Sequence, residues 1–456
     1  MSAGRPALVR GVGLLGAVAV NVITMIGIGP LITIPLVLGA LHGPLSLIGW
    51  LLGAALALCD GLVWAELGSA YPRSGGTYGY LLSVFGRTGP GALIAFLFVW
   101  QTIFAAPLLL ASGYIGFANY AGYLVPALAG SRYGLKLLAV AVGAVTLFAL
   151  YRGIKTIERV SVWLGAIAVA TLLCAAGAAF IHWSPHLAFA LAPGDSLWGG
   201  LRAGLGSALI IAMYDYVGYN AANTIADEVV TPARTLPRSI GISILLVAAT
   251  YIVLQTGVLG AVPWQQFVPL ADGTTPPLGQ HLASTIVERA LGVPAAVGIT
   301  LLILVTAFGS VYGNLLAASR IPYAAALDGN FLRPFAHVHT RHRFPDVSLL
   351  VIGGIALVAC FFTLDQVINA LTAGIVLVQS VAQIIALFVM RARGGRAPYR
   401  MWLYPLPALL ALSGWIYIFF STGASAIKYG LVTLMAGACV YFIGRVRWWP
   451  PLENGE

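Results

Sequence analysis

The sequence predicts an all-α integral membrane protein with about twelve transmembrane helices, of which the first and the sixth are discontinuous. Three observations lead to this fold class. The chain has 456 residues, of which 60% are hydrophobic and only 8% are charged, whereas a soluble protein carries about 25% charged residues. Its apolar runs are continuous, which favours helices over the alternating strands of a membrane barrel. Two of these runs, 14–40 and 201–226, are interrupted near their middle.

Twelve apolar runs are long enough to cross the hydrocarbon core of a bilayer. They lie near residues 14–40, 45–68, 90–117, 135–151, 160–181, 201–226, 239–260, 295–318, 347–363, 367–390, 402–420 and 425–444. An even number of spans places both termini on one side of the membrane. Most of the 24 lysines and arginines fall on that side, so the positive-inside rule predicts cytoplasmic termini in a cytoplasmic (inner) membrane protein.

The first span contains the segment Gly27-Ile28-Gly29-Pro30 near its middle. Inside a helix, Gly is about 1 kcal/mol and Pro about 3 kcal/mol less favourable than Ala. Backbone groups freed in lipid cost several kcal/mol more unless something satisfies them. We therefore expect an unwound segment that lines a cavity, where the glycines let a ligand approach the backbone closely. The alternative is a kink used only for helix packing.

The sixth span repeats this interruption with the polar cluster that runs from Asp215 to Asn220. Two broken spans, five helices apart and opposite in direction, are what an inverted repeat of five plus five helices predicts. We therefore divide the single membrane domain, 1–456, into a first repeat over 14–181, a second repeat over 201–390 and two additional helices over 402–444. Such an arrangement is typical of a secondary transporter with its substrate at the breaks.

The ends of the half-helices predict which substrate suits the breaks. The amides at the start of the second half of span one carry a partial positive charge and suit a carboxylate. Unwound carbonyls of Met25, Tyr214 and Val217 suit an ammonium group. Together they form a receptor for a zwitterion, such as the head group of an α-amino acid.

Polar side chains of spans three and eight are further candidates for the cavity wall, although interhelical hydrogen bonds would equally account for each of them. These candidates are Gln101, Thr102, Ser310, Tyr312 and Asn314. Tyr214, Tyr216 and Tyr219 surround the second break and could gate the cavity or stack on substrate, but aromatic packing is as common.

Asp215 is an acidic residue near the bilayer midplane, where ionisable side chains are costly and usually functional. It could carry a coupling proton or pair with a cationic substrate, and we assign it a coupling or charge-sensing role together with Ser310. The alternative is that Asp215 caps the second half of span six. Glu66, near the cytoplasmic end of span two, is expected to pair with a basic loop residue, whereas the pattern around Asp60 predicts no role.

Other classes of function are disfavoured by the pattern of residues. The four cysteines lie singly in apolar stretches and form no CxxC pair, so neither a zinc site nor a disulfide framework is expected. Residues 11–16 fit GxGxxG but open a membrane span, which argues against a dinucleotide site. We expect no enzyme activity, cofactor, metal site or nucleic-acid partner. The expected partners are an amino acid or amine, a coupling proton or sodium ion, and the lipid bilayer.

Four ordered motifs make the chain resemble the amino acid–polyamine–organocation (APC) superfamily of permeases. They are Gly27-Ile28-Gly29 with the downstream Pro35, Ala65-Glu66-Leu67 with 71–80 (YPRSGGTYGY), Asp227-Glu228 with 231–238 (TPARTLPR), and Ala318-Ser319-Arg320 with Tyr323 and Asp328-Gly329. The resemblance implies a leucine-transporter-type fold and the uptake or exchange of small α-amino acids by alternating access.

By that likeness, the amides of Ile28 and Gly29 hold the carboxylate, the carbonyls of Met25, Tyr214 and Val217 hold the amine, and Tyr214 stands at the family's gate position. Many relatives carry a lysine within span five in place of a sodium ion. Here Lys155 lies at the entrance of that span, so proton coupling and exchange both stay open. The alternatives are a polyamine or cationic amine as substrate and, in another class, an amino acid sensor that does not transport.

Overall fold

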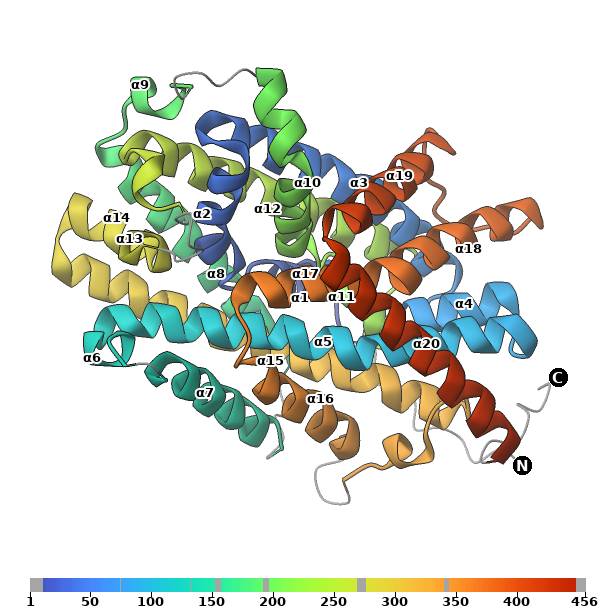
Figure 1. The fold of residues 1–456 in the computed structure, drawn as a ribbon. Helices are drawn as coiled ribbons and strands as arrows, with labels where there is room; N and C mark the ends of the chain where they lie inside the picture. The colour runs from blue at the N-terminus through green and yellow to red at the C-terminus, as the bar shows by residue number, and fades with distance from the viewer. Residues whose placement is uncertain are drawn as a thin grey trace.

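The regular structure of this chain is helical throughout the part described by the computed structural model. That part covers residues 11–73, 75–131, 133–151, 157–191, 197–268, 276–339 and 344–447. Within these ranges, extended pairing is limited to one isolated bridge between Val12 and Val229. The long helices run side by side in one bundle (Figure 1), which confirms the all-α membrane class.

The first half of the chain supplies the broken first span and four further long helices. They are α1 (Leu14–Met25) with α2 (Gly29–Leu41), α3 (Ser46–Ala70), α5 (Gly89–Leu124), α7 (Gly134–Tyr151) and α8 (Ile157–Ile181). Shorter helices connect them, namely α4 (Thr77–Phe85) and α6 (Pro126–Ala129).

The second half begins with the other broken span and ends with the two additional helices. Its elements up to span eight are α9 (Pro185–Ala188), α10 (Leu197–Tyr216), α11 (Ala221–Thr224), α12 (Pro232–Ala261), α13 (Pro277–Gln280), α14 (Leu282–Leu291) and α15 (Val293–Leu327). The rest are α16 (Asp346–Ala359), α17 (Leu364–Ile375), α18 (Val381–Ala392), α19 (Leu406–Ser421) and α20 (Ala424–Arg447).

Eight helices of the described ranges are long and apolar enough to cross a bilayer, and the bent pair α1–α2 adds a ninth. α16 and α19 are shorter apolar helices, and α10 ends at the second break. These elements lie in the twelve predicted runs, although the exact count stays a prediction.

Several helix boundaries differ from the prediction. α5 and α15 have 36 and 35 residues, so they extend well beyond the runs 90–117 and 295–318, because a helix need not end where the bilayer does. The predicted run 367–390 is also not one continuous α-helix. A π-helical segment, Val376–Ser380, separates α17 from α18, and such segments are frequent at functional sites.

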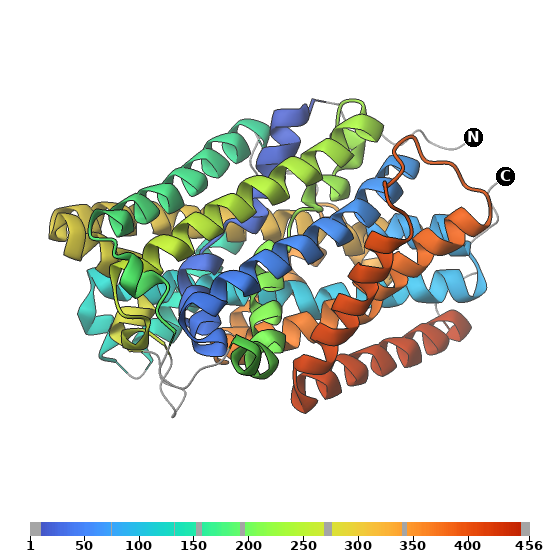
Figure 2. The same ribbon diagram turned by 90° about the horizontal axis from the view of Figure 1, so that it is seen from above.

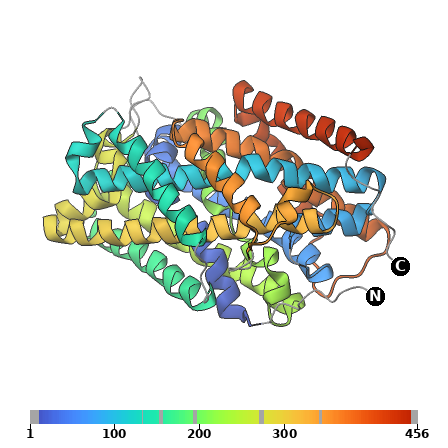
Figure 3. The same ribbon diagram turned by 90° about the horizontal axis from the view of Figure 1, so that it is seen from below.

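The broken helices are held between two pairs of long helices. α3 packs along α12 (Figure 2), and α5 packs along α15 on the opposite side of the bundle (Figure 3). α1 contacts both α12 and α15, while α10 contacts both α3 and α17. α4 lies at one end of the bundle, and α6, α13 and α14 lie at the other (Figure 1). Both breaks are therefore enclosed in the interior.

Candidate functional site

The first span breaks where its glycines predict. α1 ends at Met25, α2 begins at Gly29, and the two halves are bent by 50°. Pro30 falls in the first turn of α2, where its missing N–H would have no helical partner. The amides of Ile28 and Gly29 have no backbone acceptor within the described ranges. This helix N-terminus therefore presents free donors and a partial positive charge.

Close packing explains why glycine stands on both sides of Ile28. A Cβ atom on Gly29 would lie 2.1 Å from Oδ1 of Asp215, and one on Gly27 would lie 2.7 Å from Oγ of Ser310. Neither position has room for a side chain unless its neighbour moves. The break can therefore approach α10 and α15 this closely only with glycine at both positions.

The second break meets the first one backbone to backbone. After α10 ends at Tyr216, Gly218 adopts a φ of 127°, which favours glycine. A Cβ atom on Gly218 would lie 2.8 Å from the carbonyl carbon of Thr24, and the Thr24 hydroxyl donates to the Gly218 carbonyl at 2.9 Å. The contact brings the segment that follows α10 next to the C-terminal end of α1.

Two residues that sequence reasoning missed hold the breaks in place. The Tyr251 hydroxyl, on α12, lies 3.0 Å from the carbonyl oxygen of Met25 and 3.1 Å from that of Asp215. Oδ1 of Asn21 accepts the amide of Ala222 at 2.8 Å. The Met25 carbonyl, a predicted ligand for the amine, is thus engaged by a hydroxyl in this structure. Neither Tyr251 nor Asn21 belongs to a motif, so no signal in the sequence singles them out.

Asp215 is almost fully buried, with 2% of its surface exposed. Its Oδ2 accepts the Thr33 hydroxyl of α2 at 2.5 Å, and its Oδ1 has no hydrogen-bond partner among the described residues. The side chain does not cap α11, whose N-cap residue is Asn220. The carboxyl group instead lies against Gly29, at the start of α2.

Tyr214 stands beside the same break, as a gate residue would. Its ring lies 3.5 Å from the position that a Cβ atom on Gly29 would take. The hydroxyl donates to Oγ of Ser112 on α5 at 2.7 Å, so the phenol is anchored as well as packed.

A cavity of about 30 Å³ lies at the breaks themselves. Most of the predicted site residues stand on its wall. They are Met25, Gly27, Ile28, Gly29, Tyr214, Asp215, Ser310 and Asn314. The structure thus brings the predicted binding and coupling residues together at one point.

Two larger cavities adjoin this point around the end of α1, and Thr24 stands on the wall of all three. The larger one measures about 140 Å³ and is lined by Val217, Asn314 and small residues of α5 and α17. The other measures about 60 Å³ and is lined by Tyr312 and Arg320 of α15. The two larger cavities next to the breaks therefore lie beside α1 and α11.

Gln101 and Thr102 also lie on the wall of the 140 Å³ cavity, but their polar atoms are bonded elsewhere. Nε2 of Gln101 donates to the Gly430 carbonyl at 3.1 Å, and its Oε1 accepts the Thr433 hydroxyl at 3.0 Å, both on α20. The Thr102 hydroxyl donates to the Phe98 carbonyl of its own helix at 2.9 Å. The bonds of Gln101 match the interhelical alternative, whereas the bond of Thr102 stays within α5. The sequence could not show which face of α5 meets α20.

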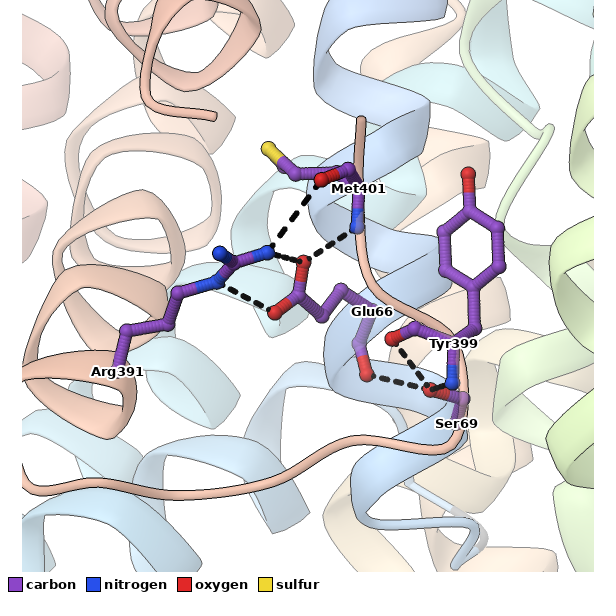
Figure 4. A network of polar contacts seen from close by, with 5 residues as sticks. All are labelled: Glu66, Ser69, Arg391, Tyr399 and Met401. Atoms are coloured by element: carbon purple, nitrogen blue, oxygen red, sulfur yellow. Dashed lines mark hydrogen bonds and ion pairs between the residues drawn. The ribbon is translucent and has the colours of Figure 1, made fainter. Parts of the chain in front are cut away.

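Glu66 lies outside these cavities, in a saturated network at the end of α3 (Figure 4). Nε and Nη2 of Arg391 each donate to its carboxylate at 2.7 Å, and the Met401 amide donates at 2.8 Å. Ser69 adds bonds with the backbone of Tyr399. Glu66 pairs with a basic residue as expected, but Arg391 belongs to the last turn of α18 and not to a loop. The network ties α3 to α18 and to the segment before α19.

Asp60 is a further buried acid, and neutral side chains donate hydrogen bonds to it. Its Oδ2 accepts the Tyr219 hydroxyl at 2.6 Å and Nε1 of Trp64 at 3.1 Å, and its Oδ1 accepts Nε1 of Trp415 at 3.1 Å. Neutral donors on three elements thus satisfy both oxygens. The arrangement links the second break to α3 and α19.

Comparison with known proteins agrees with this geometry. A family model described as amino acid permease matches residues 12–444. The chain belongs to the amino acid permease family. This permease is 26% identical over 451 residues to the serine/threonine exchanger SteT of Bacillus subtilis, covering 95% of this chain and 97% of that one. It is also 26% identical over 447 residues to the branched-chain amino acid permease BcaP of the same species, covering 92% and 91% of the two chains.

A mammalian relative extends the comparison. The mouse Asc-type amino acid transporter 1 is 26% identical over 469 residues, covering 96% of this chain and 82% of that one. The family and these relatives are amino acid transporters, and the chain is accordingly a multi-pass membrane permease for amino acids. Their names favour neither a polyamine carrier nor a sensor.

Proposed function

We propose that this permease carries small neutral α-amino acids, with the head group bound between the two breaks. One observation supports this most strongly. The N-terminal end of α2, with the amides of Ile28 and Gly29, and the C-terminal end of α10, with Tyr214, face the same small cavity. Helix N-termini attract negative groups and C-termini attract positive ones, so the two ends together complement a zwitterion.

The adjoining cavity of about 140 Å³ suits the substrate's side chain. Its walls include Ala105, Ala106, Leu371 and Gly374, and that part of the wall offers no charge. An apolar pocket of this kind accepts a small neutral side chain and disfavours a charged one, which would lose its hydration.

Alternating access fits the distribution of space around the breaks. The larger cavities lie beside α1 and α11, whereas the side of α2 is covered, because the Tyr120 hydroxyl bonds both the Leu31 carbonyl at 3.1 Å and the Ala283 amide of α14 at 3.3 Å. With the termini on the cytoplasmic side of the inner membrane, this arrangement is the inward-facing one. In the same proposal, 14–181 and 201–390 are five-helix inverted repeats and 402–444 is additional.

Transport and binding can be tested together in sealed proteoliposomes. We expect saturable uptake of radiolabelled alanine, serine or leucine, with competition among them, and thermal stabilisation of the purified protein by the same compounds. Stabilisation without uptake would mean that the protein is a sensor. The absence of both would contradict the proposed site.

A further inference from the structure

Asp215 places an acid where the proposed function puts the carboxylate of the substrate. Its Oδ1 lies 2.1 Å from the position that a Cβ atom on Gly29 would take, so it stands at the first residue of α2. This oxygen is buried and has no partner in the described part of the chain. Asp215 is also one of the residues that line a cavity adjoining both half-helices.

The neighbourhood of Asp215 provides no positive charge. The described wall of the 30 Å³ cavity, formed by α1, α2, α5, α10 and α15, contains no lysine, arginine or histidine. The titratable groups that face Asp215 are the phenols of Tyr214 and Tyr216 on its own helix and of Tyr251 on α12. Residues 162–181 of α8, which pack on α1 and α15, also carry no charged side chain.

Two ionised carboxylates do not share a buried site without a cation, because each one opposes the charge of the other. An amino acid can therefore place its carboxylate at the start of α2 only if Asp215 is neutral. Once protonated, Asp215 gains a hydroxyl donor, and a hydrogen bond between an acid and a carboxylate is a strong one. Protonation thus changes Asp215 from a group that repels the substrate into one that binds it.

We propose that Asp215 is the proton carrier of this permease and that it takes up one proton for each amino acid bound. This inference rests on the proposed head-group site. In the empty site the ionised carboxylate accepts the Thr33 hydroxyl and lies at the positive end of α2. When a zwitterion binds, Oδ1 holds the proton and donates it to the substrate carboxylate in a hydrogen bond. Substrate and proton leave together, and the carboxylate is restored.

The charge balance of this cycle defines what should be measured. A neutral amino acid moves with one proton, so each cycle carries one positive charge inward. Uptake is then driven both by a pH gradient and by a membrane potential that is negative inside. On the alkaline side of the transition, the affinity for the amino acid falls about tenfold for each pH unit, because the protonated fraction falls by that factor.

The deciding experiment compares the wild type with Asp215→Asn in proteoliposomes, with radiolabelled alanine, serine and leucine as probes. Asparagine keeps the size of the side chain, an acceptor for Thr33 and a donor for the substrate, but it cannot titrate. We expect the wild type to accumulate a probe up to about tenfold when the interior is alkaline by one pH unit and the membrane potential is held at zero. Asp215→Asn should show no accumulation, and its remaining substrate binding and counterflow exchange should not change with pH.

Asp60→Asn is the matched control, since Asp60 is a second buried acid whose oxygens are already satisfied by Trp64, Tyr219 and Trp415. It should keep accumulation driven by the pH gradient, whatever it does to thermal stability. Asp215→Ala serves as a second variant if Asp215→Asn folds poorly, and it should lose the pH response in the same way.

Three results would overturn the inference, and each is distinguishable from the others. Accumulation by Asp215→Asn would show that another group carries the proton. Loss of all alanine, serine and leucine binding by folded Asp215→Asn, with normal counterflow in the wild type, would make Asp215 an anchor for the ammonium group. Binding and transport by the wild type that do not depend on pH would remove the proton while leaving the head-group site intact. If the wild type neither binds nor exchanges these probes, the proposed function itself is wrong.

Discussion

Glu66 and Asp215 are both buried carboxylates, but they differ in their bonding partners. The protein bonds both oxygens of Glu66, whereas only one oxygen of Asp215 has a hydrogen-bond partner among the described residues. Glu66 is 1% exposed and accepts two bonds from Arg391 and one from the Met401 amide. Asp215 is 2% exposed, accepts one hydroxyl, and keeps an oxygen without a partner in the described residues. A guanidinium neutralises the first acid, and no cation lines the cavity beside the second.

The difference separates a structural acid from one that can act. Glu66 and Arg391 form an ion pair, so the loss of either side chain would leave the other charge without its counter-ion. Asp215 can change its protonation state without breaking an ion pair. A carboxylate whose oxygens are all bonded within the protein fixes helices in place. A carboxylate that lines a cavity and has an oxygen without a partner is available to a ligand or a proton.

The largest effect is expected from Gly29→Val, which places a side chain against Asp215. The new Cβ atom would take a position 2.1 Å from Oδ1 of Asp215, so either the Asp215 carboxyl group or the start of α2 must shift from its place at the head-group site. We expect amino acid uptake in proteoliposomes to fall by about 100-fold or more, with a similar yield of folded protein.

Gly177→Val is the control for Gly29→Val. Gly177 is exposed on α8, and a Cβ atom there meets nothing within 4 Å. The control should transport normally. Normal uptake by Gly29→Val would rule out the breaks as the substrate site.

The next largest effect is expected from Arg391→Met, which removes the ion-pair partner of Glu66. This change leaves the Glu66 carboxylate buried without its partner, which costs about 3 to 5 kcal/mol of the free energy of unfolding. Thermal unfolding of the purified protein measures it. The double variant Glu66→Gln/Arg391→Met should recover part of the loss, and unchanged stability of the single variant would mean that the network does not hold α3 and α18.

The sequence was sufficient to predict where backbone geometry is constrained by residue type. The glycines and proline of 27–30 predicted the end of α1, and the polar cluster 215–220 predicted the end of α10 at Tyr216. Glycine and proline act through their own backbone, so their effect does not depend on distant partners. The same argument explains why Pro30, which removes one amide from the break, is tolerated in the first turn of α2.

Side-chain partners could not be predicted in the same way. Gln101 bonds to α20, and Tyr251 bridges the two breaks, because of how helices far apart in the sequence pack. The open oxygen of Asp215 is also a tertiary property. From the sequence, a coupling proton, a cationic partner and a helix cap were all compatible with Asp215, and its position against Gly29 argues only against the cap.

A smaller effect is expected from Tyr214→Phe, at the residue next to Asp215. The variant loses the hydrogen bond to Ser112 but keeps the ring at the break, which costs about 1 kcal/mol and lowers uptake by about fivefold. Tyr214→Ala should lower it far more, because it removes a ring that lines the cavity at the break. Uptake kinetics measure both variants. If Tyr214→Phe were as inactive as Tyr214→Ala, the hydroxyl and not the ring would be the important group.

The smallest effect is expected from Glu228→Gln, which tests a third acid. Glu228 lies 2.7 Å from Nη1 of Arg320, with side chains that are 20% and 29% exposed. A pair open to solvent contributes about 0.2 to 1 kcal/mol, so thermal stability should change little. A loss of stability as large as that of Arg391→Met would show that burial is not what separates these acids.

The central claim is that the breaks bind the carboxylate and the ammonium group of one amino acid. It is tested most directly by the thermal stability of the purified wild type at acidic pH with alanine and leucine, and with ethylamine and isopentylamine, which lack only the carboxylate. We predict that at least one amino acid raises the unfolding temperature and that the matching amine does not. Equal stabilisation by an amine and its amino acid, or stabilisation by the amines alone, would contradict the claim.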